Sequence, residues 1–165
     1  MSAQPTVQQP DTISPDWAIG NAGACAEAAL LASTAFDPHF REAWTESQMA
    51  GLLAGGSSWL DLGRHNDQLI AFSLCRQVVD EVELLLCAVD PAFRRHGVGR
   101  TLVRQSAATA KGRGANRLFQ EVRDGNAPAL GLYRASGFDI SGRRPGYYRT
   151  ETGDSIDAIT LSQAL

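Results

Sequence analysis

The 165-residue chain has no apolar run near the roughly 20 residues that a membrane-spanning helix needs, so no membrane association is expected. It has only three cysteines (Cys25, Cys75 and Cys87) and no Cys-x-x-Cys pair. This argues against disulfides and structural zinc and favours a reducing, cytoplasmic compartment. Residues 1–16 contain three prolines and no basic residue, so we expect a flexible N-terminal tail and no signal peptide there. The remaining length predicts one domain, at 17–165.

Basic residues are scarce in the first 93 positions, where three of them stand against twelve acidic residues. Positions 94–165 hold twelve basic and six acidic residues, and seven basic residues with no acidic one occur from Pro91 to Arg117. A solvated basic helix face would produce this pattern, but so would a local anionic ligand. With a sequence pI of about 5.6 and no basic surface interleaved with aromatic residues, direct nucleic-acid binding is not expected.

Hydrophobic periodicity predicts helices and strands of an α+β protein with a mixed sheet. Helices are predicted at 22–36, at 45–54 with Thr45 and Gln48 as a capping box, from Val98 to Ala110, and after the N-cap Asn126. Strands are predicted at 58–62, 68–79, 81–89, 117–123, 138–140 and 155–161. The last two flank a polar loop that contains Arg143, Arg144, Tyr147 and Tyr148. The strand–helix–strand unit at 81–123 should be a parallel crossover, whereas 68–89 should form an antiparallel hairpin.

The segment 89–100 joins a predicted buried strand to the start of a helix. The first amides of a helix lack backbone partners and lie at the positive end of its dipole, so this turn can bind an anion. Gly97 and Gly99 would let the backbone approach a phosphate closely. Positive charge comes from three arginines: Arg94, Arg95 and Arg100.

Two common nucleotide-binding motifs do not fit this segment. A Rossmann fingerprint needs glycine where Leu102 stands, and a Walker A loop needs a lysine, whereas the only lysine is Lys111 within the predicted helix. The order Arg-x-x-Gly-x-Gly after Val-Asp-Pro instead resembles the pyrophosphate loop of the GNAT acetyltransferases. The stretch 118–138 is similar to the same family, with Gln-Glu-Val-Arg, an asparagine, Leu-Tyr and Gly-Phe in order. The resemblance covers about residues 81–163 and includes the Arg-Arg and Tyr-Tyr pairs of 143–148.

The resemblance implies a single GNAT domain with a mixed central sheet flanked by helices. It implies an acetyl-CoA-dependent N-acetyltransferase, most similar to members that acetylate the N-terminal alanine of a ribosomal protein. The expected partner is therefore a protein or peptide N-terminus. Two alternatives remain open, namely a small-molecule amine as acceptor, or a non-catalytic module that binds CoA.

The same resemblance implies roles for individual residues. Glu121 would be the general base and Tyr133 the general acid that protonates the leaving thiolate. Asn126 would contact the pantetheine arm as well as cap its helix. Backbone groups of Cys87, Ala88 and Val89 would pair with pantetheine as with an added strand. The pyrophosphate would bind the loop formed by Arg94, Arg95, His96, Gly97, Val98, Gly99 and Arg100.

Other interpretations of these residues remain. Glu121 could be a strand carboxylate paired with Arg117 or Arg123, and Tyr133 could be a core aromatic. Cys87 as a covalent nucleophile is disfavoured, since members of the family are thought to transfer acetyl directly. The three histidines lack metal-ligand spacing, so no metal is expected. Tyr147 and Tyr148 could line the acceptor groove or pack within a loop.

Overall fold

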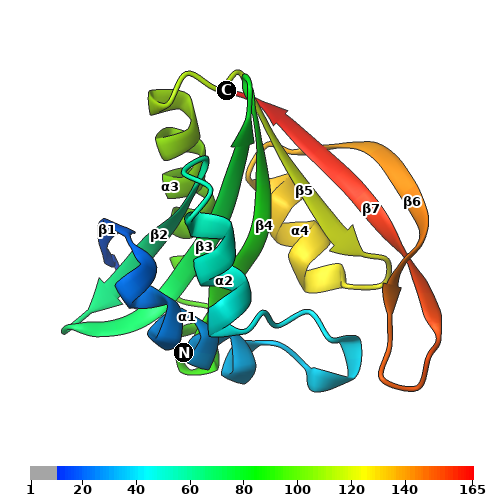
Figure 1. The fold of residues 1–165 in the computed structure, drawn as a ribbon, viewed down its shortest axis with the longest axis horizontal. Helices are drawn as coiled ribbons and strands as arrows, with labels where there is room; N and C mark the ends of the chain where they lie inside the picture. Colours follow the sequence, from blue (N-terminus) through cyan, green and yellow to red (C-terminus); the bar gives the residue numbers. More distant parts are fainter. Residues whose placement is uncertain (1–10) are drawn as a thin grey trace, which may run out of the picture.

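A mixed seven-stranded sheet forms the centre of the computed structural model, which describes residues 11–165 (Figure 1). The strand order is β1–β2–β3–β4–β5–β7–β6. The strands are β1 (Asp16–Gly20), β2 (Ser58–His65), β3 (Gln68–Val78), β4 (Glu81–Val89), β5 (Arg117–Arg123), β6 (Asp139–Arg149) and β7 (Ser155–Ala164). The helices are α1 (Cys25–Ala35), α2 (Glu46–Leu53), α3 (Val98–Gly112) and α4 (Ala127–Ala135), with short 3₁₀ turns η1 (Ala22–Ala24), η2 (Pro38–Phe40) and η3 (Pro91–Phe93).

The predicted α+β class and the parallel crossover are confirmed. β4 and β5 pair in parallel around α3, whereas every other strand pair among residues 11–165 is antiparallel. The β3–β4 hairpin lies where it was predicted, and β4 and β5 have the predicted bounds. The capping box of α2 is also present, because Gln48 N–H donates to Thr45 Oγ1 and Thr45 N–H donates to Gln48 Oε1.

Helices cover both faces of the sheet. Side chains of α1 and α2, such as Leu31 and Met49, pack in one buried cluster with Leu60 and Phe72 of the sheet. Side chains of α3 and α4 pack in a second cluster on the other face, where Tyr133 meets residues of β2, β4 and β5. β2 contributes to both clusters, with Trp59 on one face and Leu60 and Leu62 on the other, since successive side chains of a strand point to opposite faces.

Two strands differ from the prediction. β1 was not expected, since it is short and mostly exposed and carries no alternation of apolar residues. The polar loop was predicted between the strands 138–140 and 155–161, but its residues 141–149 are part of β6, an edge strand whose side chains are almost all exposed. Pro145 and Gly146 fall in the register irregularity between Arg144 and Tyr148, where the ladder is interrupted. An edge strand tolerates proline at such a bulge, so the strand continues past Pro145 and Gly146.

A β-bulge in β4 interrupts its regular pairing with β3. Leu74 pairs with Leu86 and Cys75 pairs with Leu84, so Leu85 is the extra residue. The bulge changes the facing of the strand, because Leu84 packs on the α3 and α4 side whereas Leu86 packs on the α1 and α2 side. Pairing between β4 and β5 ends at Leu84 and Gln120, and the strands then diverge as a fork (Figure 1).

The predicted tail lies largely outside the described residues, which begin at Asp11. Ile13 packs against Val98 and Leu102 of α3, and its N–H donates to the carbonyl of His96 at 3.1 Å. Asp16 is the first residue of β1. The chain therefore crosses the start of α3 before it enters the sheet.

Candidate active site

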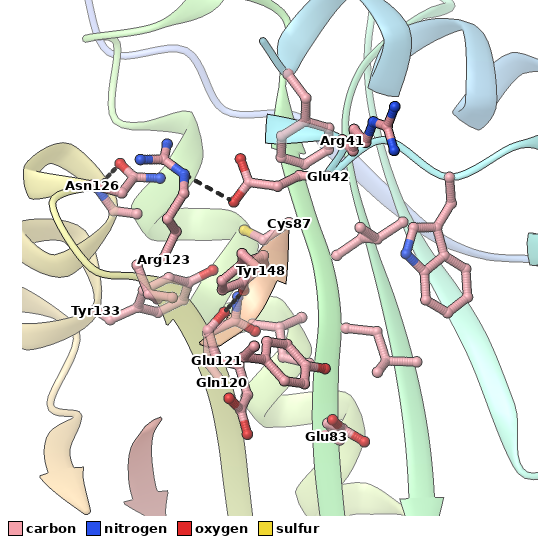
Figure 2. A pocket seen from close by; sticks show the side chains of 18 residues that line it. Arg41, Glu42, Glu83, Cys87, Gln120, Glu121, Arg123, Asn126, Tyr133 and Tyr148 are labelled. Carbon is pink, nitrogen blue, oxygen red and sulfur yellow. Dashed lines mark hydrogen bonds and ion pairs between the residues drawn. The ribbon is translucent and has the colours of Figure 1, made fainter. Parts of the chain in front are cut away.

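A cleft of about 490 Å³ opens at the fork between β4 and β5 (Figure 2). Residues of β4, β5, β6, α4 and the connection between α1 and α2 line it. Four residues assigned roles from the sequence lie in this lining: Cys87, Glu121, Asn126 and Tyr133. The fold thus brings together the predicted base, the predicted acid and two predicted cofactor contacts.

Glu121 is held within the cleft, with its side chain 14% exposed. Its Oε1 accepts a hydrogen bond from Arg144 Nη1 at 3.0 Å, and its Oε2 is buried without a hydrogen-bond partner among the described residues. The expected alternative partners, Arg117 and Arg123, do not pair with it. Arg144 comes from β6 and stacks on the ring of Tyr147 at 4.3 Å from the centroid.

Tyr133 lies on the opposite side of β5, on α4, and is only 3% exposed. Its ring packs edge-to-face on Phe138 with 5.4 Å between centroids, so it does belong to the core. Burial and the neighbouring Cys87 thiol raise the pKa of Tyr133 well above its ordinary value. Burial also raises the pKa of the Cys87 thiol to about 11. Both groups therefore hold their protons at neutral pH.

The side of β4 that faces β5 is unpaired beyond the fork. From Leu85 to Val89, no strand among residues 11–165 pairs with this side of β4, although β3 pairs with its other side. The backbone amides and carbonyls on this side are therefore free to bind an extended ligand. Ala88 is 1% exposed and faces the α1 and α2 core, so only its backbone can take part. Asn126 lies across the fork as the N-cap of α4, where its Oδ1 accepts from Ala129 N–H at 3.3 Å.

The predicted phosphate loop follows β4 and lies outside the lining of the cleft. Gly97 is the N-cap of α3 with φ of 80°, and it has no side chain to cap the first amides of the helix. Arg95 also has a left-handed φ of 63°, a conformation that is costly for a residue with a side chain. A side chain at Gly99 would meet Leu132 of α4 at 3.4 Å, which is the lower limit of ordinary van der Waals contact. The loop thus has the free amides that an anion site requires.

The arginines of this loop differ in their surroundings. Arg94 donates from Nη2 to the carbonyl of Ala35 at 2.7 Å and from Nε to Val89, so its side chain ties the loop to the end of α1. Arg95 and Arg100 make no ion pair with another described residue and are exposed. His96 uses Nδ1 in a 2.8 Å contact with the carbonyl of Arg94. These contacts place Arg95 and Arg100, rather than Arg94, as the free cations beside the helix start.

Glu42 was missed by the sequence reasoning, whereas Tyr147 and Tyr148, considered there as possible lining of the acceptor groove, do line the cleft. Glu42, from the connection between α1 and α2, faces Arg123 of β5 across the cleft, with 3.6 Å between Oε1 and Nε (Figure 2). Tyr148 of β6 donates from its hydroxyl to the carbonyl of Glu121 at 3.0 Å. Burial raises the pKa of Tyr148 well above its ordinary value. No local pattern marks Glu42, because it precedes a helix in an irregular segment.

No described helix is long and apolar enough to cross a membrane. Residues 11–165 contain no group of three or more His, Cys, Asp or Glu side chains arranged to hold a metal ion.

Comparison with known proteins defines the class. Residues 27–138 match the model of the acetyltransferase (GNAT) family. The chain belongs to this family and is an acetyl-CoA-dependent N-acetyltransferase, which confirms the predicted fold and enzyme class.

Individual members of the family are similar to this chain in sequence and structure. The chain is 37% identical over 120 residues to the [ribosomal protein bS18]-alanine N-acetyltransferase of Salmonella typhimurium, covering 72% of this chain and 79% of that one. The crystal structure of the ribosomal-protein-S18-alanine N-acetyltransferase from Escherichia coli has a TM-score of 0.78 at 29% identity and covers 90% of this chain and 94% of that chain. A nourseothricin acetyltransferase structure has a TM-score of 0.62, also at 29% identity, over 67% and 66% of the two chains. The predicted resemblance to the alanine N-acetyltransferases is therefore confirmed.

Proposed function

We propose that this enzyme transfers acetyl from acetyl-CoA to the N-terminal α-amine of a protein, namely the N-terminal alanine of a ribosomal protein in the cytoplasm. The observation that carries the proposal is the cleft at the fork, which is lined from opposite sides of the sheet by a carboxylate and a buried tyrosine. The similarity to the alanine N-acetyltransferases of Salmonella typhimurium and Escherichia coli supports the choice of acceptor.

The residues present fit acetyl-CoA as the donor substrate. The unpaired edge of β4 from Leu85 to Val89 would pair with the amides of the pantetheine arm. The free amides at the start of α3, with Arg95 and Arg100 beside them, would hold the pyrophosphate. Asn126 would contact the arm from the opposite side of the fork. Acetyl-CoA supplies an activated thioester, and the protein supplies position and proton transfer.

Glu121 would accept a proton from the acceptor ammonium, and the resulting neutral amine would then attack the thioester carbonyl. Arg144 fixes one carboxylate oxygen, and the unpartnered Oε2 keeps the capacity to accept a proton, directly or through a water molecule. An amide at the bulge of β4 would donate to the carbonyl oxygen as negative charge develops on it.

Tyr133 would protonate the thiolate as it leaves. Because its pKa is raised by burial, Tyr133 remains a proton donor across the neutral and mildly alkaline range. Cys87 is next to this position, but with a pKa of about 11 its thiol is almost entirely protonated at neutral pH. Direct transfer to the amine is therefore favoured over an acetyl-cysteine intermediate.

The test is incubation of the enzyme and acetyl-CoA with a peptide that begins with alanine and has its lysine side chains blocked. Intact-mass analysis should find one added acetyl group, and fragmentation should place it on the α-amine. A peptide with a blocked N-terminus is the matched control and should remain unmodified. Acetylation of small amines such as aminoglycosides in place of the peptide would contradict the proposed acceptor, and binding of acetyl-CoA without turnover on any amine would contradict catalysis.

A further inference from the structure

Three carboxylates line the cleft, and they differ in whether the protein donates hydrogen bonds to them. Glu83 is hydrogen-bonded to Arg76 at 2.6 Å, and Glu121 is hydrogen-bonded to Arg144 at 3.0 Å. Glu42 accepts no hydrogen bond from any residue between 11 and 165. Of the three, Glu42 therefore has the most unused capacity for hydrogen-bond donors.

Arg123, the cation that faces Glu42 most directly, is also held by another contact. The guanidinium carbon of Arg123 lies 3.4 Å from the centroid of the Phe40 ring, and the 3.6 Å between Nε and Glu42 Oε1 exceeds a hydrogen bond. Both charged side chains are largely withdrawn from solvent, with Glu42 15% and Arg123 13% exposed. A carboxylate withdrawn from water gains most from a donor that enters the cleft.

The position of Glu42 suits a ligand that also reaches Glu121. Glu42 approaches from the connection between α1 and α2, whereas Glu121 belongs to β5, and Figure 2 shows both beside Tyr148. The hydroxyl of Tyr148 donates to the backbone carbonyl of Glu121 at 3.0 Å, and Glu42 and Tyr148 line the same cleft. Burial raises the pKa of Glu42 above its ordinary value, and the nearby Arg123 guanidinium offsets this only in part.

We propose that Glu42 binds the ammonium group of the acceptor and positions its nitrogen between Glu42 and Glu121 for attack. A primary ammonium carries three N–H donors and a full positive charge, which matches the unfilled acceptor sites of this carboxylate. The proposal rests on the function proposed above and adds a residue for recognition of the acceptor. Glu42 favours the charged amine and so contributes binding, whereas removal of the proton remains with Glu121.

If Glu42 binds the amine and Glu121 removes its proton, substitutions of the two residues should change different kinetic parameters. An interaction made with the substrate before the reaction changes KM more than kcat. Glu42→Gln should raise the KM of the acceptor about 10- to 100-fold, the range of one charge-assisted hydrogen bond, with kcat within about threefold of wild type. The KM of acetyl-CoA should not change. The matched control is Glu83→Gln, which makes the same substitution in a carboxylate already satisfied by Arg76 and should leave the acceptor KM unchanged.

A second measurement separates recognition of the amine from a structural role. The inhibitor is the same peptide with its alanine replaced by a propionyl group, so that only the amine is missing. Its inhibition constant should be equal for wild type and Glu42→Gln, because the lost contact involves only the ammonium. A parallel rise in that inhibition constant, or an unchanged acceptor KM, would overturn the proposal. If wild type acetylates a small amine and not the peptide, the proposed acceptor is wrong, and the same comparison with that amine and its desamino analogue decides the role of Glu42.

Discussion

Replacing Tyr133 by phenylalanine removes one hydroxyl from the cofactor side of the cleft and leaves the ring in place. The ring is 3% exposed and packs on Phe138, and phenylalanine keeps both contacts. The hydroxyl adjoins the Cys87 thiol, a weak hydrogen-bonding group, so its loss should cost about 1 kcal/mol of unfolding free energy at most. Stability and acetyl-CoA affinity should therefore change little.

The catalytic cost should be larger. A positioned general acid contributes roughly 10²- to 10⁴-fold to the rate. The leaving group is a thiolate, which is far less basic than an alkoxide or an amide anion, so it departs partly without help and the lower end of that range applies. We expect Tyr133→Phe to lower kcat by about 100-fold, equivalent to about 2.7 kcal/mol of activation free energy.

The raised pKa of Tyr133 adds a condition on pH. A raised pKa means that the neutral, proton-donating form persists to higher pH than for free tyrosine. The loss in kcat should therefore be similar at about pH 7 and about pH 9, because ionisation of Tyr133 does not begin within that range.

The assay follows release of the CoA thiol with saturating acetyl-CoA and acceptor, and calorimetry measures acetyl-CoA affinity. Phe138→Leu is the control, since it loosens the packing of the same ring and should lower stability by about 1 kcal/mol while retaining kcat. Wild-type kcat in Tyr133→Phe would refute the reasoning. An equal loss of kcat in Phe138→Leu would also refute it, because the effect would then come from packing.

Three further predictions concern the base, the phosphate loop and the core. Glu121→Gln keeps the hydrogen bond from Arg144 but cannot accept a proton, so kcat should fall about 100-fold with little change in acceptor KM, and steady-state kinetics showing wild-type kcat would exclude the assigned role. Ile13→Pro removes the N–H that donates to His96, so the KM of acetyl-CoA should rise about fivefold while that of the acceptor does not, and equal changes in both would contradict a local effect. Asp61 is fully buried and accepts hydrogen bonds from three side chains. Asp61→Ala should therefore lower the free energy of unfolding, measured in urea, by about 3 kcal/mol. A loss below about 1 kcal/mol would show that its partners find other acceptors.

Much of the candidate site was accessible from local sequence patterns. The loop at 94–100 combines a strand end, two glycines and a helix start, and each of these signals acts within a few residues. Asn126 could be assigned as an N-cap for the same reason, and the structure confirms that its side chain caps α4. The roles of Glu121 and Tyr133 came from resemblance to a family, and their assignment as base and acid stays a prediction.

The strands that the sequence did not predict, β1 and most of β6, are the two edge strands of the sheet. The start of β6 was predicted as the strand 138–140, but beyond it β6 contains proline and glycine among exposed, mostly polar residues, so its periodicity does not indicate a longer strand. It forms because β7 offers a partner along its length, and β7 is buried against β5 on its other side. Cross-strand pairing between segments remote in sequence thus overrode the local turn signals.

Local patterns were sufficient for most of the elements, for the crossover and for the turn proposed to bind an anion, because helix periodicity, capping and glycine conformation depend on neighbouring residues. Three-dimensional packing was needed for the bulge at Leu85, the fork it borders, and the partners of each charge. Arg144 rather than Arg123 pairs with Glu121, and Glu42 joins the cleft from the connection between α1 and α2. These contacts join residues far apart in the chain, so they follow from how the sheet and its covering segments pack, and no short-range pattern encodes them.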